Sequence, residues 1–359
     1  MKKNMCFLLV CMLVFTFGAC SQGSTSSSEA QPSGSESASA TMPESEAEPA
    51  APAADGPVAP AGFPSKEITL IVPLNAGGGT DLMCRKLAEI IQVQYGVNIV
   101  ISNVPGSGGV VGLNQALTSA ADGYTISLVG ATGISTMIRG ELGFTADDMT
   151  FLIPLYGMNH VIIVNANSEY DTPEKLIEAA KASPGTITIG HNGTFNTAQA
   201  GLIALGNAYG DPNLFKSMPF DGASRAMTEL MGGHIDAMIV GIGDALAQIK
   251  SGELVPILGL SFDKIKGFED IATVTDLGLS EDSFENVTYV RWLICGPGGM
   301  DNDVAAYVSA LFAGAMQTPE FQQYAADGAY DVDTTTGPAM RALFDDYYKT
   351  VETWSKYFS

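Results

Sequence analysis

Short apolar runs rich in Val, Ile, Leu and Thr recur along the chain after Pro64, and longer stretches with helical spacing separate most of them. The runs expected to be strands are residues 68–72, 99–101, 125–129, 161–164, 186–189, 237–240, 257–258 and 292–295. In the first intervening stretch Met83, Leu87 and Ile90 recur at the spacing of one helical face. Strands that alternate with helices predict βαβ units, an α/β fold and mainly parallel sheets.

Helix-start signals strengthen this prediction. Asp171-Thr-Pro-Glu-Lys175 and Gln317-Thr-Pro-Glu320 each place a capping residue before a proline and a glutamate, an order that suits the first turn of a helix. Ser183-Pro-Gly185 is expected to end the first of these helices. Residues 338–358 are expected to form a long amphipathic helix.

The first twenty residues read as a targeting segment. Lysines at positions 2 and 3 precede an apolar run over residues 5–17, and Gly18 and Ala19 lead to Cys20. This run is too short to span a membrane, so residues 1–20 are predicted to be a cleaved signal peptide. The end of the segment resembles a bacterial lipobox, in which the cysteine after the cut is lipidated. The alternative is an ordinary secretory cut that leaves Cys20 unmodified.

A low-complexity segment follows, over residues 21–63. Up to about residue 62 it consists largely of Ser, Ala, Pro, Gly and Glu, and it holds six acidic residues and no Lys or Arg. Such a composition buries too little apolar surface to offset the entropy of ordering, so the segment is predicted to be a disordered tether. Its flexible-coil reach is roughly 35 Å. A lipid and a tether together predict an extracytoplasmic body held close to a membrane.

Charge and cysteine usage narrow the possible functions. The net charge is −22, which argues against nucleic acid as a partner because binding it requires clustered Lys and Arg. Of five cysteines, only Cys84 and Cys295 lie in the body of the chain. Two residues make no zinc pattern, and their pairing stays open. Each is expected to pack as a small buried residue.

Two polar loops stand out because each follows a predicted strand and precedes a helix. In parallel sheets ligands bind at such carboxyl ends of strands. Residues 73–81 (PLNAGGGTD) could bind an anion through exposed N–H groups, but the Lys of a nucleotide-binding loop is absent. The alternative is a tight turn with Thr80 or Asp81 as the helix N-cap. Residues 190–197 offer many donors, and His191 there is either a donor or switch, or a solvated or capping residue.

Catalytic and cofactor signatures are missing from the sequence. It contains neither G-x-S-x-G nor H-E-x-x-H, and its three histidines have no metal-ligand spacing. No cofactor, metal or catalytic residue is therefore expected, and a binding protein is favoured over an enzyme.

A family resemblance now joins these features. Residues 68–81 (ITLIVPLNAGGGTD) resemble the opening of the extracytoplasmic solute receptors of tripartite tricarboxylate transporters, also called the Bug family. Further matches follow in order at residues 103–109, 121–125, 183–190, 219–223, 232–236, 249–252 and 295–298. Together these matches run from about residue 66 to the C-terminus.

The resemblance implies a type II periplasmic-binding-protein-like fold, in which two α/β lobes close on a ligand like a Venus flytrap. Lobe 1 would comprise residues 64–163 plus 288–359, and lobe 2 residues 164–287. The implied partners are a small carboxylate ligand and the large and small integral membrane subunits of a transporter. The receptor itself is expected to be a monomer, lipid-anchored at the cell surface or in the periplasm.

The resemblance also implies which residues bind the ligand. They are Asn75, Ala76, Gly77, Gly78, Gly79, Thr80 and Asp81 in the first loop, Gly190, His191, Asn192, Gly193, Thr194, Asn196 and Thr197 in the second, Phe220, Asp221, Gly222, Ala223 and Ser224 in a third, and Ala131 and Thr132 after the third strand. One ligand carboxylate is expected to be gripped by backbone N–H groups of the first two loops and by the side chains of Thr80, Asn192, Asn196 and Thr197.

Three positions depart from the family pattern. Asp221 stands where the family often has Lys, Val240 where it often has an acid, and Gln199 where it usually has His. An acid at position 221 would repel a distal second carboxylate, so a ligand with a neutral or cationic tail is expected. Two other functions stay open: a surface-anchored enzyme on the same scaffold, and a receptor that reports to a sensor kinase. Adjacent genes for one large and one small multi-span protein would favour the transporter.

Overall fold

The computed structural model describes residues 56–281, 284 and 288–358. The predicted signal peptide, Cys20 and most of the predicted tether lie outside the described residues, so these predictions stay predictions. No described helix is both long enough and apolar enough to cross a membrane.

One strand order runs through the described residues, namely β2-β1-β3-β10-β4-β7-β5-β6, with β8 beside β4 and β9 beside β8. In chain order the strands are β1 (Ile68–Val72), β2 (Ile99–Asn103), β3 (Thr125–Val129), β4 (Met149–Asn165), β5 (Thr188–Asn192), β6 (Lys216–Phe220), β7 (Ala237–Gly241), β8 (Leu254–Gly259), β9 (Ala272–Thr273) and β10 (Tyr289–Pro297). Two parallel groups, β2-β1-β3 and β7-β5-β6, flank the long strands β4 and β10, which are antiparallel to their neighbours.

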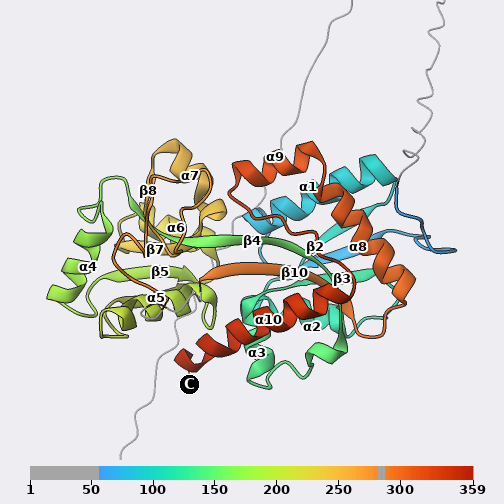
Figure 1. The fold of residues 1–359 in the computed structure, drawn as a ribbon, viewed down its shortest axis with the longest axis horizontal. Coiled ribbons are helices and arrows are strands. Elements are labelled where there is room, and N and C mark those ends of the chain that lie inside the picture. The colour runs from blue at the N-terminus through green and yellow to red at the C-terminus, as the bar shows by residue number, and fades with distance from the viewer. Residues whose placement is uncertain (1–55, 282–283, 285–287, 359) are drawn as a thin grey trace, which may run out of the picture. The chain divides into compact units, whose positions relative to one another are not determined.

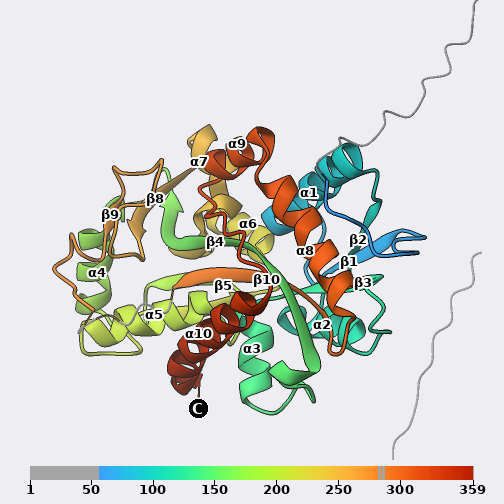
Figure 2. The ribbon, with the colours of Figure 1, turned by 45° about the vertical axis from the view of Figure 1, so that its right-hand side comes forward.

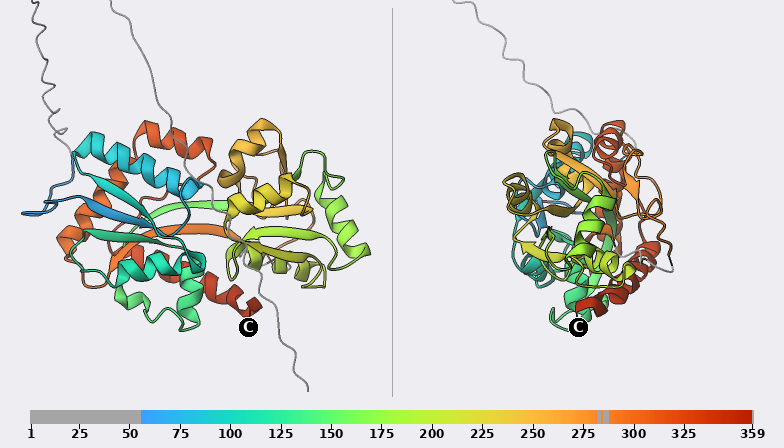
Figure 3. Two further views of the ribbon diagram at one scale, coloured as in Figure 1. Left: turned by 180° about the vertical axis from the view of Figure 1, so that it is seen from behind. Right: turned by 90° about the vertical axis from the view of Figure 1, so that its left-hand side faces the viewer.

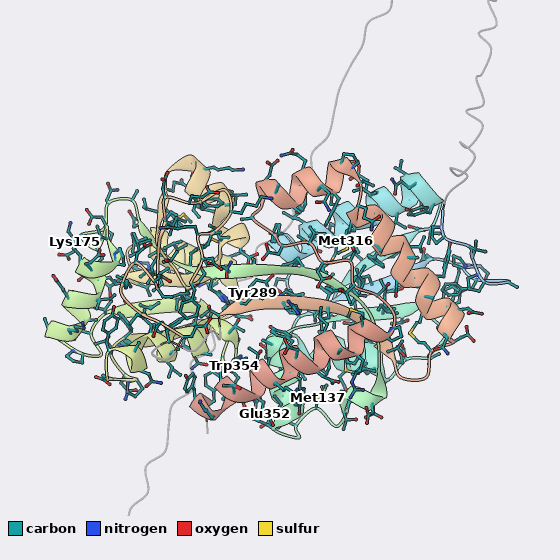
Figure 4. All side chains as sticks on the ribbon, in the orientation of Figure 1. Met137, Lys175, Tyr289, Met316, Glu352 and Trp354 are labelled. Carbon is teal, nitrogen blue, oxygen red and sulfur yellow. The ribbon has the colours of Figure 1, made fainter. Side chains whose placement is uncertain are left out.

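Strand β4 links the two lobes without interruption (Figure 1). Its residues 149–159 pair with β10, and its residues 160–165 pair with β7 and β8. Tyr289, labelled in Figure 4, starts β10 opposite Asn159, and its hydroxyl donates to Asp331 Oδ2 at 2.7 Å. Strand β4 belongs to both lobes, so its pairing does not mark the residue at which one lobe ends. The residue limits expected for the two lobes therefore stay a prediction.

Helices cover both faces of the first lobe's sheet (Figures 1 and 2). On one face lie α1 (Gly79–Tyr95), α8 (Asn302–Met316) and α9 (Pro319–Asp327), and on the other α2 (Val110–Leu117), α3 (Ala131–Ile138) and α10 (Pro338–Ser355). Successive side chains of a strand point to opposite faces of the sheet, so one strand contributes to both helix layers. In β3, Ile126 and Leu128 pack toward α1 and α8, whereas Val129 packs toward α2 and α3.

The second lobe repeats this layering, as Figure 3 shows from behind. Helices α4 (Pro173–Ala182) and α5 (Thr197–Ala208) share the core that contains α10, and α6 (Ala223–Met231) and α7 (Leu246–Ser251) cover the other face. Between β7 and α7 lies the short 3-10 helix η3 (Ile242–Ala245). The two-lobed α/β fold with flanking helices is thus confirmed.

Strong local signals predicted the elements best. Strands β1 and β3 have the predicted limits, and helices α4 and α9 begin at the predicted prolines, with Thr172 and Thr318 as side-chain caps. Strand β6 was not predicted, because its sequence KSMPF holds only two large apolar residues and includes a proline. Strand β5 begins and ends later than predicted, which moves Gly190, His191 and Asn192 from the second loop into the strand.

Both body cysteines are buried and free, which confirms that they pack as small core residues. Burial raises the pKa of both thiols well above its usual range. Within the described part of the chain, no group of three or more His, Cys, Asp or Glu side chains is placed to hold a metal ion.

Candidate functional site

The carboxyl ends of parallel strands bring the predicted loops to common edges. Strands β1, β2 and β3 are parallel, so the loops that follow them leave one edge of the first lobe's sheet. Strands β7, β5 and β6 are likewise parallel neighbours in that order. The segments that follow them, η3, residues 193–196 and residues 221–222, therefore leave one edge of the second lobe's sheet.

The first loop ends in a helix start without a side-chain cap. Helix α1 begins at Gly79, and its N-cap is Gly78 in extended conformation. The alternative prediction that Thr80 or Asp81 would be the N-cap is therefore wrong. Among the described residues, no acceptor reaches the N–H groups of Gly78, Gly79 or Thr80. The positive end of the α1 dipole is thus available to an anion.

The buried Asp81 carboxylate holds the first loop from behind. It accepts hydrogen bonds from the Gly77 N–H at 2.8 Å, Asn103 Nδ2 at 2.9 Å and Arg85 Nε at 3.0 Å. Burial alone would raise the pKa of Asp81, but these hydrogen bonds and the Arg85 charge lower it below its ordinary value. Asp81 therefore positions the loop backbone.

Thr80 also points into the protein. Its side chain is buried, and Thr80 Oγ1 lies 2.7 Å from the Tyr156 hydroxyl oxygen. In contrast, Asn75, Ala76 and Gly77 are exposed. The exposed part of this loop therefore offers backbone donors rather than the Thr80 hydroxyl.

The second loop is held by its own side chains. Asn196 is the N-cap of α5, and its Oδ1 accepts from the Gln199 N–H at 3.0 Å while its Nδ2 donates to the Asn192 carbonyl. Gln199 Oε1 in turn accepts from the Phe195 N–H at 2.8 Å. Asn196 and Thr197 are buried, whereas Thr194 and Phe195 are exposed. The predicted grip by the Asn196 side chain stays untested, but both ends of that amide already have partners.

Phe195 adopts a backbone conformation that bulky residues rarely take. Its φ is +56°, in the left-handed region. Its ring centroid lies 4.4 Å from the Arg139 guanidinium carbon at the end of α3 and 5.4 Å from the ring centroid of Phe358. Arg139 is itself held by Ser135 Oγ and Glu141. These contacts fix the tip of the second loop against α3 and the C-terminal segment.

His191 is neither solvated nor on a loop, which corrects the prediction for its surroundings. It lies in β5 with no exposed surface, and its Nε2 is 2.7 Å from Ser217 Oγ. Burial lowers the pKa of His191 to about 4. The imidazole is therefore neutral at physiological pH, and a switch in that range is excluded.

The third loop meets the first. Phe220 ends β6, and a left-handed turn at Gly222 (φ +96°) leads into α6 at Ala223. A Cβ on Gly222 would lie 3.7 Å from Asn75 Nδ2. Asp221 and Ser224 are exposed beside this contact.

The fourth predicted region follows β3, which lies beside β1 in the sheet. Ala131 and Thr132 form the first turn of α3, with Ala131 buried. The Thr132 methyl group instead approaches Gly108, where an added Cβ would lie 2.5 Å away. Within the described residues, no hydrogen bond links either residue to the other three loops.

A carboxylate not predicted from the sequence completes the arrangement. Asp244 lies in η3, and a Cβ on Gly79 would be 2.5 Å from Asp244 Oδ1 and 2.7 Å from the Tyr330 hydroxyl oxygen. Burial raises the pKa of Asp244 to about 6. The sequence did contain a signal for this residue: Asp244 ends a glycine-containing turn, residues 241–244, that follows a predicted strand.

These contacts fix the order of the loops across the interface of the lobes. The first loop touches Gly222 through Asn75 and Asp244 through Gly79. On the second lobe's sheet, β5 lies between the strands that carry those two residues. Residues 193–196 therefore leave the sheet between the segments that carry those two residues.

Comparisons with known proteins agree with this architecture. BugT of Bordetella pertussis is 29% identical over 299 residues, which cover 81% of this chain and 89% of BugT. The periplasmic binding protein BugD has a TM-score of 0.72 at 24% identity, covering 82% of this chain and 97% of BugD. An R. palustris protein with adipate has a TM-score of 0.73 at 19% identity, covering 82% and 96%. At these identities the structural likeness shows the fold alone.

A family model settles the relationship. The model of the tripartite tricarboxylate transporter family receptor matches residues 83–351. This range covers well over half of the chain, including α1 after its first turn, both strands between the lobes and the second and third loops. The chain therefore belongs to the tripartite tricarboxylate transporter receptor family.

Proposed function

We propose that this protein is an extracytoplasmic solute-binding lipoprotein that captures a small carboxylate ligand between its lobes and delivers it to the two membrane subunits of a tripartite transporter. The observation that carries the proposal is the N-terminus of α1, which has no side-chain cap and lies against η3 of the other lobe, beside the strand that leads into the second glycine loop. A helix N-terminus offers roughly half a positive charge and several unpaired N–H donors.

Local donors are needed because the protein as a whole is acidic. A net charge of −22 slows the encounter with an anion, so binding has to come from short-range contacts. The first loop supplies such contacts through the N–H groups of Gly78, Gly79 and Thr80. Adipate in the R. palustris relative supports a carboxylate ligand for this chain.

The anchoring part of the proposal rests on sequence. Cys20 follows an apolar run and small residues, and a polar segment separates it from the folded body. Membership of a transporter receptor family supports delivery to membrane subunits. The lipid on Cys20 would keep the receptor near those subunits.

Gly78 allows a sharp test of the carboxylate site. Its backbone is extended, and an added Cβ would meet only the Asn75 carbonyl oxygen, at 3.8 Å. Asp is a preferred N-cap residue, so Gly78→Asp would place its own carboxylate on the α1 N–H groups without disturbing the fold. Gly78→Ala fills the same space without a charge and is the matched control.

The experiment identifies the ligand first and then perturbs the site. Mass spectrometry of small molecules released from the purified protein identifies a ligand, and calorimetry measures its affinity for the wild type and both variants. We expect Gly78→Asp to keep the wild-type fold, checked by thermal melting, and to lose at least a hundredfold in affinity, while Gly78→Ala loses less than tenfold. Unchanged affinity in Gly78→Asp would overturn the proposed site.

A further inference from the structure

Asp244 is a carboxylate at the ligand-facing edge that the proposed function does not use. It follows β7 directly and lies against the first turn of α1, which belongs to the other lobe. The rings of Tyr156 and Tyr330, whose centroids are 5.0 Å apart, lie beside it. Three chain segments distant in sequence thus surround one partly buried acid.

Asp244 has no hydrogen-bonding or ion-pair partner in the part of the chain that the structure describes. Of the residues that the structure describes, none donates a hydrogen bond to Asp244, and no Lys, Arg or His forms an ion pair with it. Both neighbouring tyrosines are neutral, because burial raises the pKa of each hydroxyl far above the physiological range. The start of α1 beside Asp244 offers only a partial positive charge. A partly buried carboxylate is stabilised by a full ion pair with hydrogen bonds, which points to a cationic donor supplied from outside.

The position of Asp244 relative to the carboxylate site limits what that group can be. Strands β7 and β5 are neighbours, and neighbouring strands lie about 4.8 Å apart. Asp244 and the second loop therefore leave the sheet one strand apart, and Asp244 lies against Gly79 of the first loop. A group that reaches Asp244 while a carboxylate occupies the loops is therefore expected to lie near that carboxylate in the ligand.

We propose that Asp244 accepts the ammonium group of a zwitterionic ligand, so that the ligand class is amino acids rather than simple carboxylic acids. This inference rests on the proposed function, since it places the ligand carboxylate on the glycine loops. The α-carboxylate then faces N–H donors, and the α-ammonium faces Asp244. Without an ammonium group, a carboxylate at the α1 N-terminus would lie close to the Asp244 charge and be repelled by it.

The role assigned to Asp244 differs from that expected for Asp221. Asp221 lies on the opposite side of the second loop, after β6, and is exposed. It would face the distal part of the ligand, whereas Asp244 recognises a group next to the carboxylate. The two acids therefore give two separable effects, and Asp221→Asn is a control of matched chemistry.

The test uses pairs of ligands that differ only in the ammonium group. Calorimetry on the purified protein compares each L-amino acid with its deaminated acid, for example alanine with propionate and glutamate with glutarate. Wild type, Asp244→Asn and Asp221→Asn are measured at pH 7.5, and thermal melting confirms that each variant folds. A hydrogen bond between charged groups predicts a preference of about tenfold to a hundredfold for the amino acid of the best-bound pair.

Asp244→Asn is expected to reduce this preference at least tenfold, while Asp221→Asn leaves it within threefold. The inference is overturned if deaminated acids bind as tightly as amino acids, or if Asp244→Asn keeps the preference. Either result leaves the carboxylate site in place. Failure of the proposed function looks different: amino acids would bind equally well to Gly78→Asp and to the wild type.

Discussion

The two glycine-containing loops solve the same structural problem in opposite ways. The loop before α1 has no side-chain cap, and a buried carboxylate, Asp81, holds its backbone from behind. The loop before α5 caps itself with Asn196, and the ring of Phe195 fixes its tip. Both loops connect a parallel strand to a helix, yet only the first leaves the start of its helix without a side-chain cap.

Under the proposed function, this difference gives the two loops different parts in ligand binding. The first loop carries the electrostatic attraction, because the N–H groups at the start of α1 have no acceptor among the described residues. The second loop supplies shape and a smaller number of donors, since the Asn196 side chain already occupies the Gln199 N–H. Asp81 and Phe195 are the braces of the first and second loop, because each holds its loop in place. Substituting one of them is therefore a direct way to weaken the contribution of one loop at a time.

The largest effect is expected from Asp81→Ala, which breaks the brace of the first loop. It leaves the Gly77 N–H and the Asn103 amide without their acceptor; a lost buried partner costs about 1–3 kcal/mol, which corresponds to a melting temperature about 5 °C lower. We also expect at least a hundredfold loss of ligand affinity by calorimetry. Because the pKa of Asp81 is lowered in the folded protein, this stability is present above its unfolded pKa and is lost as the pH falls below about 4.

Asp171→Ala is the matched control for Asp81→Ala. Asp171 also forms an ion pair with a residue four positions along the chain, Lys175, but both side chains are more than half exposed. Exposed pairs contribute about 0–1 kcal/mol, so melting should shift by less than about 2 °C. Equal effects of the two variants on ligand affinity would contradict the positioning role of Asp81.

A smaller effect is expected from Phe195→Ala, which breaks the brace of the second loop. The variant loses the contacts with Arg139 and Phe358 and frees a strained loop tip. We expect about tenfold weaker ligand binding by calorimetry, with a melting temperature within about 2 °C of the wild type, since exposed side chains contribute little to stability.

Val255→Ala is the control for Phe195→Ala. Val255 on β8 and Phe195 have the same exposed fraction, 37%, but Val255 lies away from the loops. It should leave ligand affinity unchanged. A wild-type affinity in Phe195→Ala would show that the second loop needs no brace.

The smallest effect concerns stability without ligand. The pKa of Asp244 is raised to about 6 by burial, so the charged form destabilises the folded protein. The protonated acid stabilises it below the unfolded pKa of about 4, and this stability is lost as the pH rises through about 6. We expect Asp244→Asn to melt about 2–4 °C higher than the wild type at pH 8 and with no difference near pH 4. An equal gap at both pH values, by scanning calorimetry, would contradict the account of Asp244.

The sequence contained enough information for the fold and for the positions of the loops, but not for the direction of their side chains. Apolar runs and proline signals predicted β1, β3, α4 and α9 because those signals are local. Strand β6 was not predicted because its stability comes from pairing with β5 rather than from its own composition.

Side-chain roles depended on contacts between distant segments. Thr80 looked like a ligand donor, yet it bonds to Tyr156, 76 positions away. Asp244 was not singled out from the sequence, and only the approach of Gly79 and Tyr330 shows its position between the lobes. Such contacts have no signature in one sequence.

The most direct test is a crystal structure of the protein with the ligand recovered from it. The account predicts a carboxylate within hydrogen-bonding distance of the N–H groups of residues 78–80 and of the loop at 193–195, and an ammonium nitrogen within about 3.2 Å of an Asp244 oxygen. A carboxylate bound elsewhere, with the start of α1 left in contact with water, would contradict the central claim that the uncapped helix is the anion site.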